Sequence, residues 1–117
     1  MVIFMIHEMK LQPKFFDFIK KGTKRIELRL NDEKRQLINI GDTIEFLKEP
    51  EKKEKLETKV IGLLNYSSFN DLFSDFDIGI LSDKSMTKEE LLNVLQEFYT
   101  IEKQKKYGVI GIRVKLE

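Results

Sequence analysis

The sequence contains no cysteine and no tryptophan, and its 117 residues include one histidine, His7. Without cysteine the chain forms neither a disulfide nor a thiolate metal site, and one histidine is too few for a histidine-based metal cluster. No glycine-rich phosphate loop of a recognised spacing occurs. These absences exclude several classes of metalloenzyme and P-loop enzyme, and we expect neither a metal site nor a cofactor.

Long apolar runs are also missing from the sequence. None approaches the ~18 consecutive residues that a membrane span needs. Residues 1–7 are too short for a signal peptide and lack its basic start. We therefore expect a cytoplasmic protein without a membrane segment, and the sequence leaves protein partners and oligomeric state open.

What the chain does contain is enough apolar material for one core. Hydrophobic residues make up 41% of the sequence, and nine residues are phenylalanine. A chain of this length buries roughly 65% of its unfolded surface, so residues 1–117 are predicted to form a single domain. Lysine and arginine are concentrated in residues 10–35 and 103–117, whereas residues 36–102 are acidic. Basic ends favour an anionic ligand, but a lysine-rich, salt-bridged surface explains the same composition.

The first half of the chain is predicted to consist of four strands and one helix. Val2–Ile6 is a continuous apolar run, short enough to be a strand that is buried on both faces. A helix begins at Pro13, where proline is favoured in the first turn, and ends at Gly22. Three further strands are expected, the last two around a charged hairpin tip: residues 25–30, 43–48 and 57–64.

The second half is predicted to be mainly helical until a final strand. Ser68 begins a short helix, and residues 76–85 have no clear period and are interpreted as an irregular connection. Thr87 and Glu90 have the spacing of a capping box, which opens a longer helix that the charged residues 102–106 end. The last strand covers residues 108–116. About five strands, mostly antiparallel, and about three helices indicate an α+β, barrel-like fold.

The most informative segment is the strand that follows Gly22. Ile26, Leu28 and Leu30 alternate with Arg25, Glu27 and Arg29, and Lys24 precedes them. Successive strand residues point to opposite faces, so the charged side chains share one face while the apolar ones face a core. The charged row is either an ion-pair ladder worth about 0–1 kcal/mol or the floor of a site for an anionic ligand. In the second case Arg29 forks onto a phosphate or carbonyl.

Two other polar residues are candidates for a local role. His7 lies at the end of the first predicted strand, where a histidine is most often a surface or hydrogen-bonded residue rather than a catalytic one. Asp42 follows Gly41 in a tight turn, and a carboxylate in that position usually accepts hydrogen bonds from its own backbone.

These pieces together resemble the ASCH domain, a branch of the PUA-like superfamily. The resemblance rests on residues 22–29 after a phenylalanine-rich helix, on Ile40-Gly41-Asp42 before a strand, and on the closing residues 107–112. It covers nearly the whole chain, with the order and spacing of the motifs intact. It implies a pseudo-barrel of about five to six strands, mostly antiparallel, with helices closing its ends.

The same resemblance implies a cleft for RNA or a nucleotide-like ligand, built around Lys24, Glu27 and Arg29. Lys24 and Arg29 would meet a phosphate or a base carbonyl, and Glu27 would accept from an exocyclic amine or position Lys24. Arg25 belongs to the same charged row. Aromatic rings stack on bases without sequence preference, and the rings proposed for this are Tyr66 and Tyr107.

One branch of the family is enzymatic and hydrolyses the acetyl amide of N4-acetylcytidine. Lys24 matches the lysine of its motif, but Glu27 stands where that branch has a threonine nucleophile. Its acidic residue falls near Lys84, beside Asp83. The alternative reading is therefore a small hydrolase acting on a modified nucleoside or on RNA, for which Lys24, Glu27 and His7 are the candidate acid–base groups. A third possibility is a protein-binding domain that uses the acidic middle of the chain.

Overall fold

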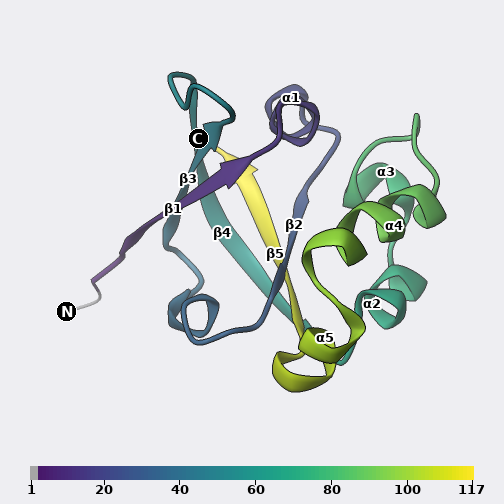
Figure 1. The fold of residues 1–117 in the computed structure, drawn as a ribbon. Coiled ribbons are helices and arrows are strands. Elements are labelled where there is room, and N and C mark those ends of the chain that lie inside the picture. Colours follow the sequence, from purple (N-terminus) through teal and green to yellow (C-terminus); the bar gives the residue numbers. More distant parts are fainter. Residues whose placement is uncertain (1–2) are drawn as a thin grey trace.

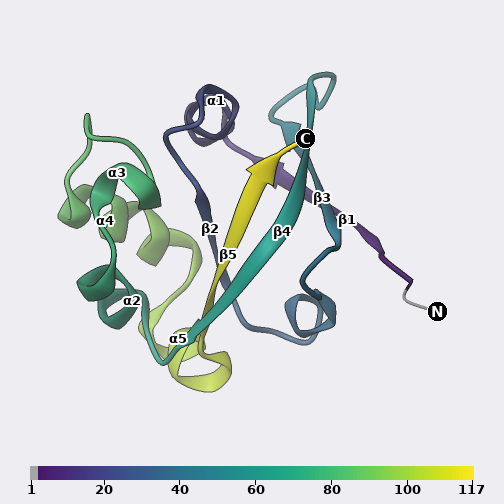
Figure 2. The same ribbon diagram turned by 180° about the vertical axis from the view of Figure 1, so that it is seen from behind.

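The computed structural model describes residues 3–117 and shows one bent sheet with helices on one side and at one end (Figures 1 and 2). The sheet has the strand order β1-β3-β4-β5-β2. β1 runs parallel to β3, and the other neighbours are antiparallel. The elements are β1 (Ile6–Leu11), α1 (Pro13–Lys21), β2 (Ile26–Leu30), the 3₁₀ turn η1 (Arg35–Leu37), β3 (Thr43–Lys48), β4 (Lys55–Tyr66), α2 (Phe69–Asp75), α3 (Ile78–Leu81), α4 (Lys88–Phe98), α5 (Ile101–Tyr107) and β5 (Val109–Leu116).

The sheet separates two clusters of buried apolar residues. Its concave side holds Ile44, Phe46 and Ile112 together with Phe16 and Ile19 of α1, which closes one end. The opposite side of β2 packs against α2, α3 and α4 (Figure 1) through Ile26, Leu28 and Leu30. The α+β half-barrel that results confirms the predicted fold class.

Local signals in the sequence predicted several element boundaries. α1 begins at Pro13 and ends at Gly22, which adopts the left-handed conformation with φ 89°. α4 begins at the predicted capping box, in which the Thr87 hydroxyl accepts from the Glu90 backbone and the Glu90 carboxylate accepts from the Thr87 backbone. β2 and β5 also occur where the alternating pattern placed them.

The first strand is shifted from its predicted position. The apolar run Val2–Ile6 was expected to be a strand buried on both faces; Val2 lies outside the described residues, and β1 begins only at Ile6. Ile6 pairs with Thr43, the first residue of β3, so the sheet offers no ladder partner to residues 3–5. Residues 3–6 are instead exposed, at 77% for Ile3 and 70% for Ile6.

The helical half has two more helices than the sequence pattern indicated. Within the predicted irregular segment, the Asp77 side chain caps the four-residue helix α3 by accepting from the Gly79 backbone at 3.0 Å. Residues 102–106 were expected to end a helix, but they form most of α5, which Thr100 caps and Gly108 follows. Among the helices of residues 3–117, none has the length and apolar character needed to cross a bilayer.

Candidate functional site

A pocket of about 260 Å³ lies between β2, the junction of β1 with α1, and α4. Charged and polar residues line one part of it and apolar residues the other. β2 is an edge strand and contributes three consecutive residues to the lining, Glu27 and Arg29 from one face and Leu28 from the other. The full lining is Lys10, Leu11, Gln12, Phe15, Lys24, Glu27, Leu28, Arg29, Glu49, Leu91, Val94, Leu95, Phe98 and Tyr99.

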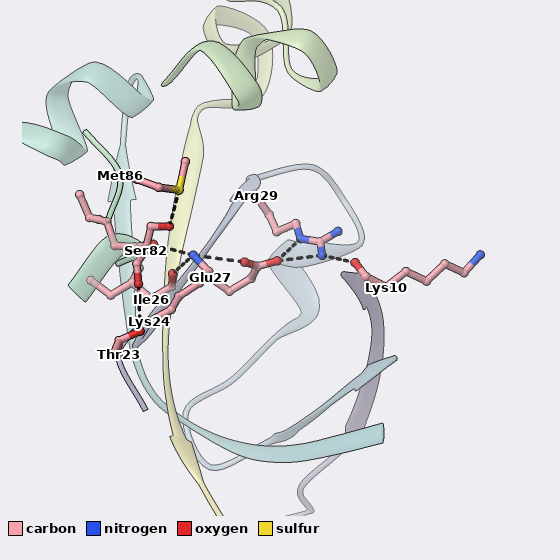
Figure 3. Close-up of polar contacts among 9 residues, drawn as sticks. Lys10, Thr23, Lys24, Ile26, Glu27, Arg29, Ser82 and Met86 are labelled. Atoms are coloured by element: carbon pink, nitrogen blue, oxygen red, sulfur yellow. Dashed lines mark hydrogen bonds and ion pairs between the residues drawn. The ribbon is translucent and has the colours of Figure 1, made fainter. Parts of the chain in front are cut away.

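Lys24 is buried at the floor of this pocket, with 3% of its surface exposed. Its Nζ donates to the carbonyl oxygens of Ile26 at 2.6 Å and Leu81 at 2.7 Å, and it lies 3.6 Å from Glu27 Oε1 (Figure 3). Burial lowers the pKa of Lys24, although the neighbouring Glu27 charge opposes this change. The ammonium group therefore joins β2 to the end of α3 and compensates the negative charge of the Glu27 carboxylate.

Arg29 approaches Glu27 from the other side and reaches across to β1. Its Nε and Nη2 each lie 2.8 Å from Glu27 Oε2, and Nη2 also donates to the Lys10 carbonyl at 2.8 Å (Figure 3). Burial disfavours the charged guanidinium, but Glu27 and Tyr99 outweigh burial and raise the pKa of Arg29. A permanently cationic side chain thus connects the two edge strands of the half-barrel.

The ion-paired floor leaves one carboxylate oxygen without a close donor. Glu27 Oε2 is occupied by Arg29, whereas Oε1 lies 3.6 Å from Lys24 Nζ and accepts no hydrogen bond of standard length from any residue between 3 and 117. The Arg29 guanidinium beside it also interacts with Tyr99. The floor therefore places an acceptor next to a cationic group, an arrangement that complements the hydrogen-bonding edge of a nucleobase or an amide.

Aromatic and aliphatic side chains form the facing wall. α4 contributes Leu91, Leu95 and Phe98, and Tyr99 follows directly after the helix. Phe98 is 53% exposed, while the Tyr99 ring packs 5.8 Å from the Phe69 ring, centroid to centroid. Two aromatic rings therefore lie at this wall. Neither residue was predicted from the sequence as part of a site, and the only signal for such a role is their aromatic character.

The structure brings together three of the predicted site residues and places the others elsewhere. Arg25, Tyr66 and Tyr107 do not line the pocket. Arg25 is exposed and donates weakly to the Gly22 carbonyl, and the Tyr66 hydroxyl donates to Asp75 at 2.5 Å. Tyr107 packs against the buried cluster beneath the helices, with Lys106 Nζ 5.1 Å from its ring centroid.

His7 and Asp42 form a separate polar contact at the start of the parallel strand pair. The His7 Nε2 atom lies 2.7 Å from Asp42 Oδ2, which also accepts from the Asn39 backbone at 3.0 Å, and Oδ1 accepts from the Met5 backbone at 3.0 Å. Asp42 is buried, which disfavours its charge, but these hydrogen bonds prevail and lower its pKa. The predicted backbone-binding role of Asp42 is confirmed, and His7 does not line the pocket.

Of the candidate residues for a hydrolase, Lys24 and Glu27 line the pocket, whereas His7, Asp83 and the nearby hydroxyl of Thr23 do not. The Thr23 hydroxyl donates to the carbonyls of Phe18 and Ser82, and Asp83 accepts from the Ser85 backbone and pairs with Lys21 at 3.3 Å. Neither residue is part of the lining, which contains no serine, threonine, cysteine or histidine. Across residues 3–117, no group of three or more histidine or acidic side chains is arranged to hold a metal ion.

The comparisons with known proteins agree with this fold. A family model described as the ASCH domain matches residues 9–117. A hypothetical protein of known crystal structure is similar to the chain at 38% identity and TM-score 0.83, over 96% of this chain and 99% of that one. A Pyrococcus furiosus protein solved by NMR is 37% identical with TM-score 0.73, over 95% and 96%.

A more distant likeness concerns the fold alone. The crystal structure of ASCH from Zymomonas mobilis is 14% identical with TM-score 0.65, and the match covers 94% of this chain and 66% of that one. None of the curated proteins matches the chain.

Proposed function

This chain belongs to the ASCH domain family, whose fold is PUA-like, and we propose that it is a binding module for RNA or a nucleotide-like ligand that it does not turn over. The observation that carries this proposal is the composition of one pocket. Its floor presents the Glu27 and Arg29 side chains, and its facing wall presents Phe98 and Tyr99. Polar edge recognition together with aromatic stacking is how proteins read single-stranded bases.

The size of the pocket supports a ligand of one base rather than a duplex. Small-molecule sites usually enclose roughly 300–1,000 Å³, and this pocket, at about 260 Å³, lies just below that range. A single base turned out of a strand, or a free nucleoside, is the unit of that size. Bases become available in this way in single-stranded loops and ends, which are the usual targets of sequence-specific RNA recognition.

Charge supports an anionic ligand at the mouth of the pocket. Lys10 is exposed and lines the pocket, and Arg29 projects toward the same strand because it bonds to the Lys10 carbonyl. When a base stacks on the α4 wall, the Lys10 ammonium is the cation available to its phosphate. Lys24 does not serve this purpose, because two backbone carbonyls and Glu27 surround its ammonium group.

Binding without turnover is favoured over the hydrolase alternative by the composition of the lining. The lining contains no serine, threonine, cysteine or histidine to act as a nucleophile or base. Its buried carboxylate, Glu27, lies between two cations and is held by Arg29. This geometry suits Glu27 to accept a hydrogen bond from an exocyclic amine.

The test measures binding of fluorescein-labelled single-stranded RNAs and of free nucleosides, including N4-acetylcytidine, to wild type and to Arg29→Gln. We expect the variant to bind at least about tenfold more weakly, since a good base-edge contact contributes ~1–3 kcal/mol. Arg113→Gln is the matched control, because Arg113 is an exposed arginine of β5 outside the lining.

Equal affinity of Arg29→Gln and wild type for every ligand would contradict the placement of the site. Turnover is tested separately by chromatography of the same mixtures. Cytidine released from N4-acetylcytidine, or shortened RNA, would show a hydrolase instead of a binding module.

A further inference from the structure

Residues 3–6, which we call the arm, lead into β1 and include its first residue. They are apolar on both faces of the chain and largely exposed in the described structure. Ile3, Phe4, Met5 and Ile6 are 77%, 57%, 55% and 70% exposed. In β1, the odd-numbered Met9 and Leu11 are buried in the core. By the alternation of strand residues, Ile3 and Met5 lie on the same face as Met9 and Leu11 but are exposed. Phe4 and Ile6 lie on the opposite face. A segment of this composition is suited to burial on both sides.

This segment is joined to a larger apolar patch by the turn before β3. The Phe4 ring occupies the place that a Cβ at Gly41 would take, which brings it beside Ile40. Ile40 is 61% exposed, and Leu37 in η1 is 64% exposed. We call residues 3–6 with Leu37 and Ile40 the arm patch. It contains six of the ten large apolar residues that are exposed between residues 3 and 117.

The arm also presents a free strand edge. β1 is the outermost strand of the sheet, and its odd-numbered residues bond to β3, since the carbonyls of Met5 and Leu11 accept from Thr43 and Glu49. The Lys10 carbonyl faces the other way, toward Arg29. By the same alternation, the backbone groups of Phe4 and Ile6 face outward. Unpaired strand edges of this kind are templates for another strand.

Hydrogen bonds at the base of the arm fix its position. Asp42 is buried, and its carboxylate accepts from the Met5 backbone and contacts His7. The Met5 carbonyl accepts from the Thr43 backbone at 2.9 Å. Figure 1 shows the chain before β1 directed away from the rest of the molecule. The arm is therefore anchored at its base while its apolar side chains project outward.

We propose that the arm patch is a dimer interface, in which the arm of a second copy of this chain adds to β1 in antiparallel orientation about a two-fold axis at Met5. In this register Phe4 lies opposite Ile6 of the other copy, and Ile3 lies opposite His7. The two sheets become one continuous sheet, and each arm covers the other. The interface is independent of the ligand pocket and of the function proposed for it.

A second copy fits this surface because the arm is complementary to itself. A two-fold axis places each residue near its own counterpart, so a charge near the axis would meet a like charge. Residues 3–6 carry no charge, and Glu8 lies beyond the paired segment. The segment also lacks the lysine or proline with which free edges are commonly protected.

A cysteine cross-link tests both the dimer and its register. The chain has no cysteine, so Met5→Cys introduces a single thiol at the proposed axis. Residues opposite each other in a non-hydrogen-bonded pair have Cα atoms about 4.5 Å apart, which a disulfide spans. Under mild oxidation, we expect Met5→Cys to form a covalent dimer at least about tenfold faster than Ile3→Cys or Ile61→Cys. Ile61 is the control because it is 50% exposed on β4, outside the arm patch.

Sedimentation equilibrium provides the second measurement. Wild type is expected to dimerise in the micromolar range, and Ile6→Glu to raise the dimer dissociation constant at least about tenfold, with Ile61→Glu unchanged. A wild-type protein that is monomeric up to several hundred micromolar would overturn the proposal, and so would equal cross-linking of the three cysteine variants. Far-UV circular dichroism checks that each variant is folded.

Discussion

At the scale of single residues, Glu27 is the shared counter-charge of the two cations at the floor of the pocket. Lys24 and Arg29 are both largely removed from water, with side chains 2% and 13% exposed, and each has Glu27 as its counter-charge. The surface pair of Lys20 with Glu54 is different, because its side chains are 58% and 43% exposed. Exposed pairs contribute little to stability, whereas removing one member of a buried pair leaves an uncompensated charge.

Glu27→Gln is therefore expected to destabilise the protein by about 3 kcal/mol, measured by urea denaturation at pH 7. The neutral amide leaves the buried Lys24 ammonium and the Arg29 guanidinium without their counter-charge. Glu45→Gln is the control, since Glu45 pairs at 3.6 Å with the exposed Lys55 and its loss is expected to change stability little. Similar losses of unfolding free energy in both variants would show that the buried ion pairs of Glu27 contribute no more to stability than an exposed pair.

Asp42 is one residue through which the stability of the protein is expected to depend on pH in the acid range. Hydrogen bonds from His7 and from the backbones of Asn39 and Met5 overcome burial and lower the pKa of Asp42 in the folded protein. A carboxyl with a lowered folded pKa stabilises the protein above its unfolded pKa, about 3.9, and this contribution is lost as the pH falls through the folded pKa.

Asp42→Asn should therefore be less stable than wild type by about 2 kcal/mol at pH 7, and the difference should shrink below about pH 4. Urea denaturation of both proteins from pH 7 to pH 3 measures it. A difference that stays constant over this range would mean that the carboxylate charge is not what holds the arm and the turn.

At the scale of elements, α4 connects a local folding signal to the site. The capping box at Thr87 begins the helix whose inner face supplies Leu91, Leu95 and Phe98 to the pocket. The orientation of the aromatic wall thus depends on how firmly the first turn of this helix is formed.

Thr87→Ala is expected to lower the free energy of unfolding by about 1 kcal/mol, because the Glu90 backbone N–H loses its acceptor. Urea denaturation gives the value. Ser74→Ala, which removes an exposed hydroxyl that donates to the Asn70 carbonyl, should stay within about 0.5 kcal/mol of wild type. A loss of unfolding free energy of the same size in both variants would indicate that the capping hydrogen bond of Thr87 does not contribute to stability.

Elements defined by local chemistry could be predicted from the sequence, and those defined by distant partners could not. Pro13, Gly22 and the pair Thr87 and Glu90 mark helix ends whatever the rest of the chain does. The start of β1 depends on where β3 begins, thirty-seven residues later, since Ile6 pairs with Thr43. α3 has four residues, too few to establish a helical period.

The same difference explains what could be predicted of the site. Glu27 and Arg29 lie two residues apart on one face of β2, so their proximity follows from the sequence, whereas Lys24 precedes the strand and reaches Glu27 from outside it. Phe15 and Phe98 reach the pocket from α1 and α4, and nothing in the spacing of the sequence indicates that these helices meet across β2. Tyr66 ends β4 and Tyr107 ends α5, and the fold places both outside the lining.

At the scale of the whole molecule, the half-barrel stays open between its edge strands, and the pocket, which both of these strands line, lies in that opening. Lys10 is at the mouth, on β1, and Lys14 is a nearby exposed lysine of α1 that does not line the pocket. These two residues allow the electrostatic part of binding to be measured with a matched pair.

Lys10→Ala is expected to reduce the slope of log affinity for single-stranded RNA against log salt concentration by about 0.7, because one phosphate contact is lost. Fluorescence anisotropy titrations between 50 and 300 mM salt, values chosen to span roughly the screening range, measure the slope. Lys14→Ala should keep the wild-type slope. Equal reductions in the two variants would point to a diffuse basic surface instead of a defined mouth.

The strand order also has a consequence for when the site comes into existence. β3 and β4 are consecutive in sequence and pair with each other, whereas β2 joins the sheet only through β5, the last strand of the chain. Contacts between such remote segments form slowly. During synthesis the strand that carries Glu27 and Arg29 must therefore wait until β5 has left the ribosome. A product that stops before β5 holds the site residues but has no sheet partner for β2, so the pocket is among the last features of this domain to form.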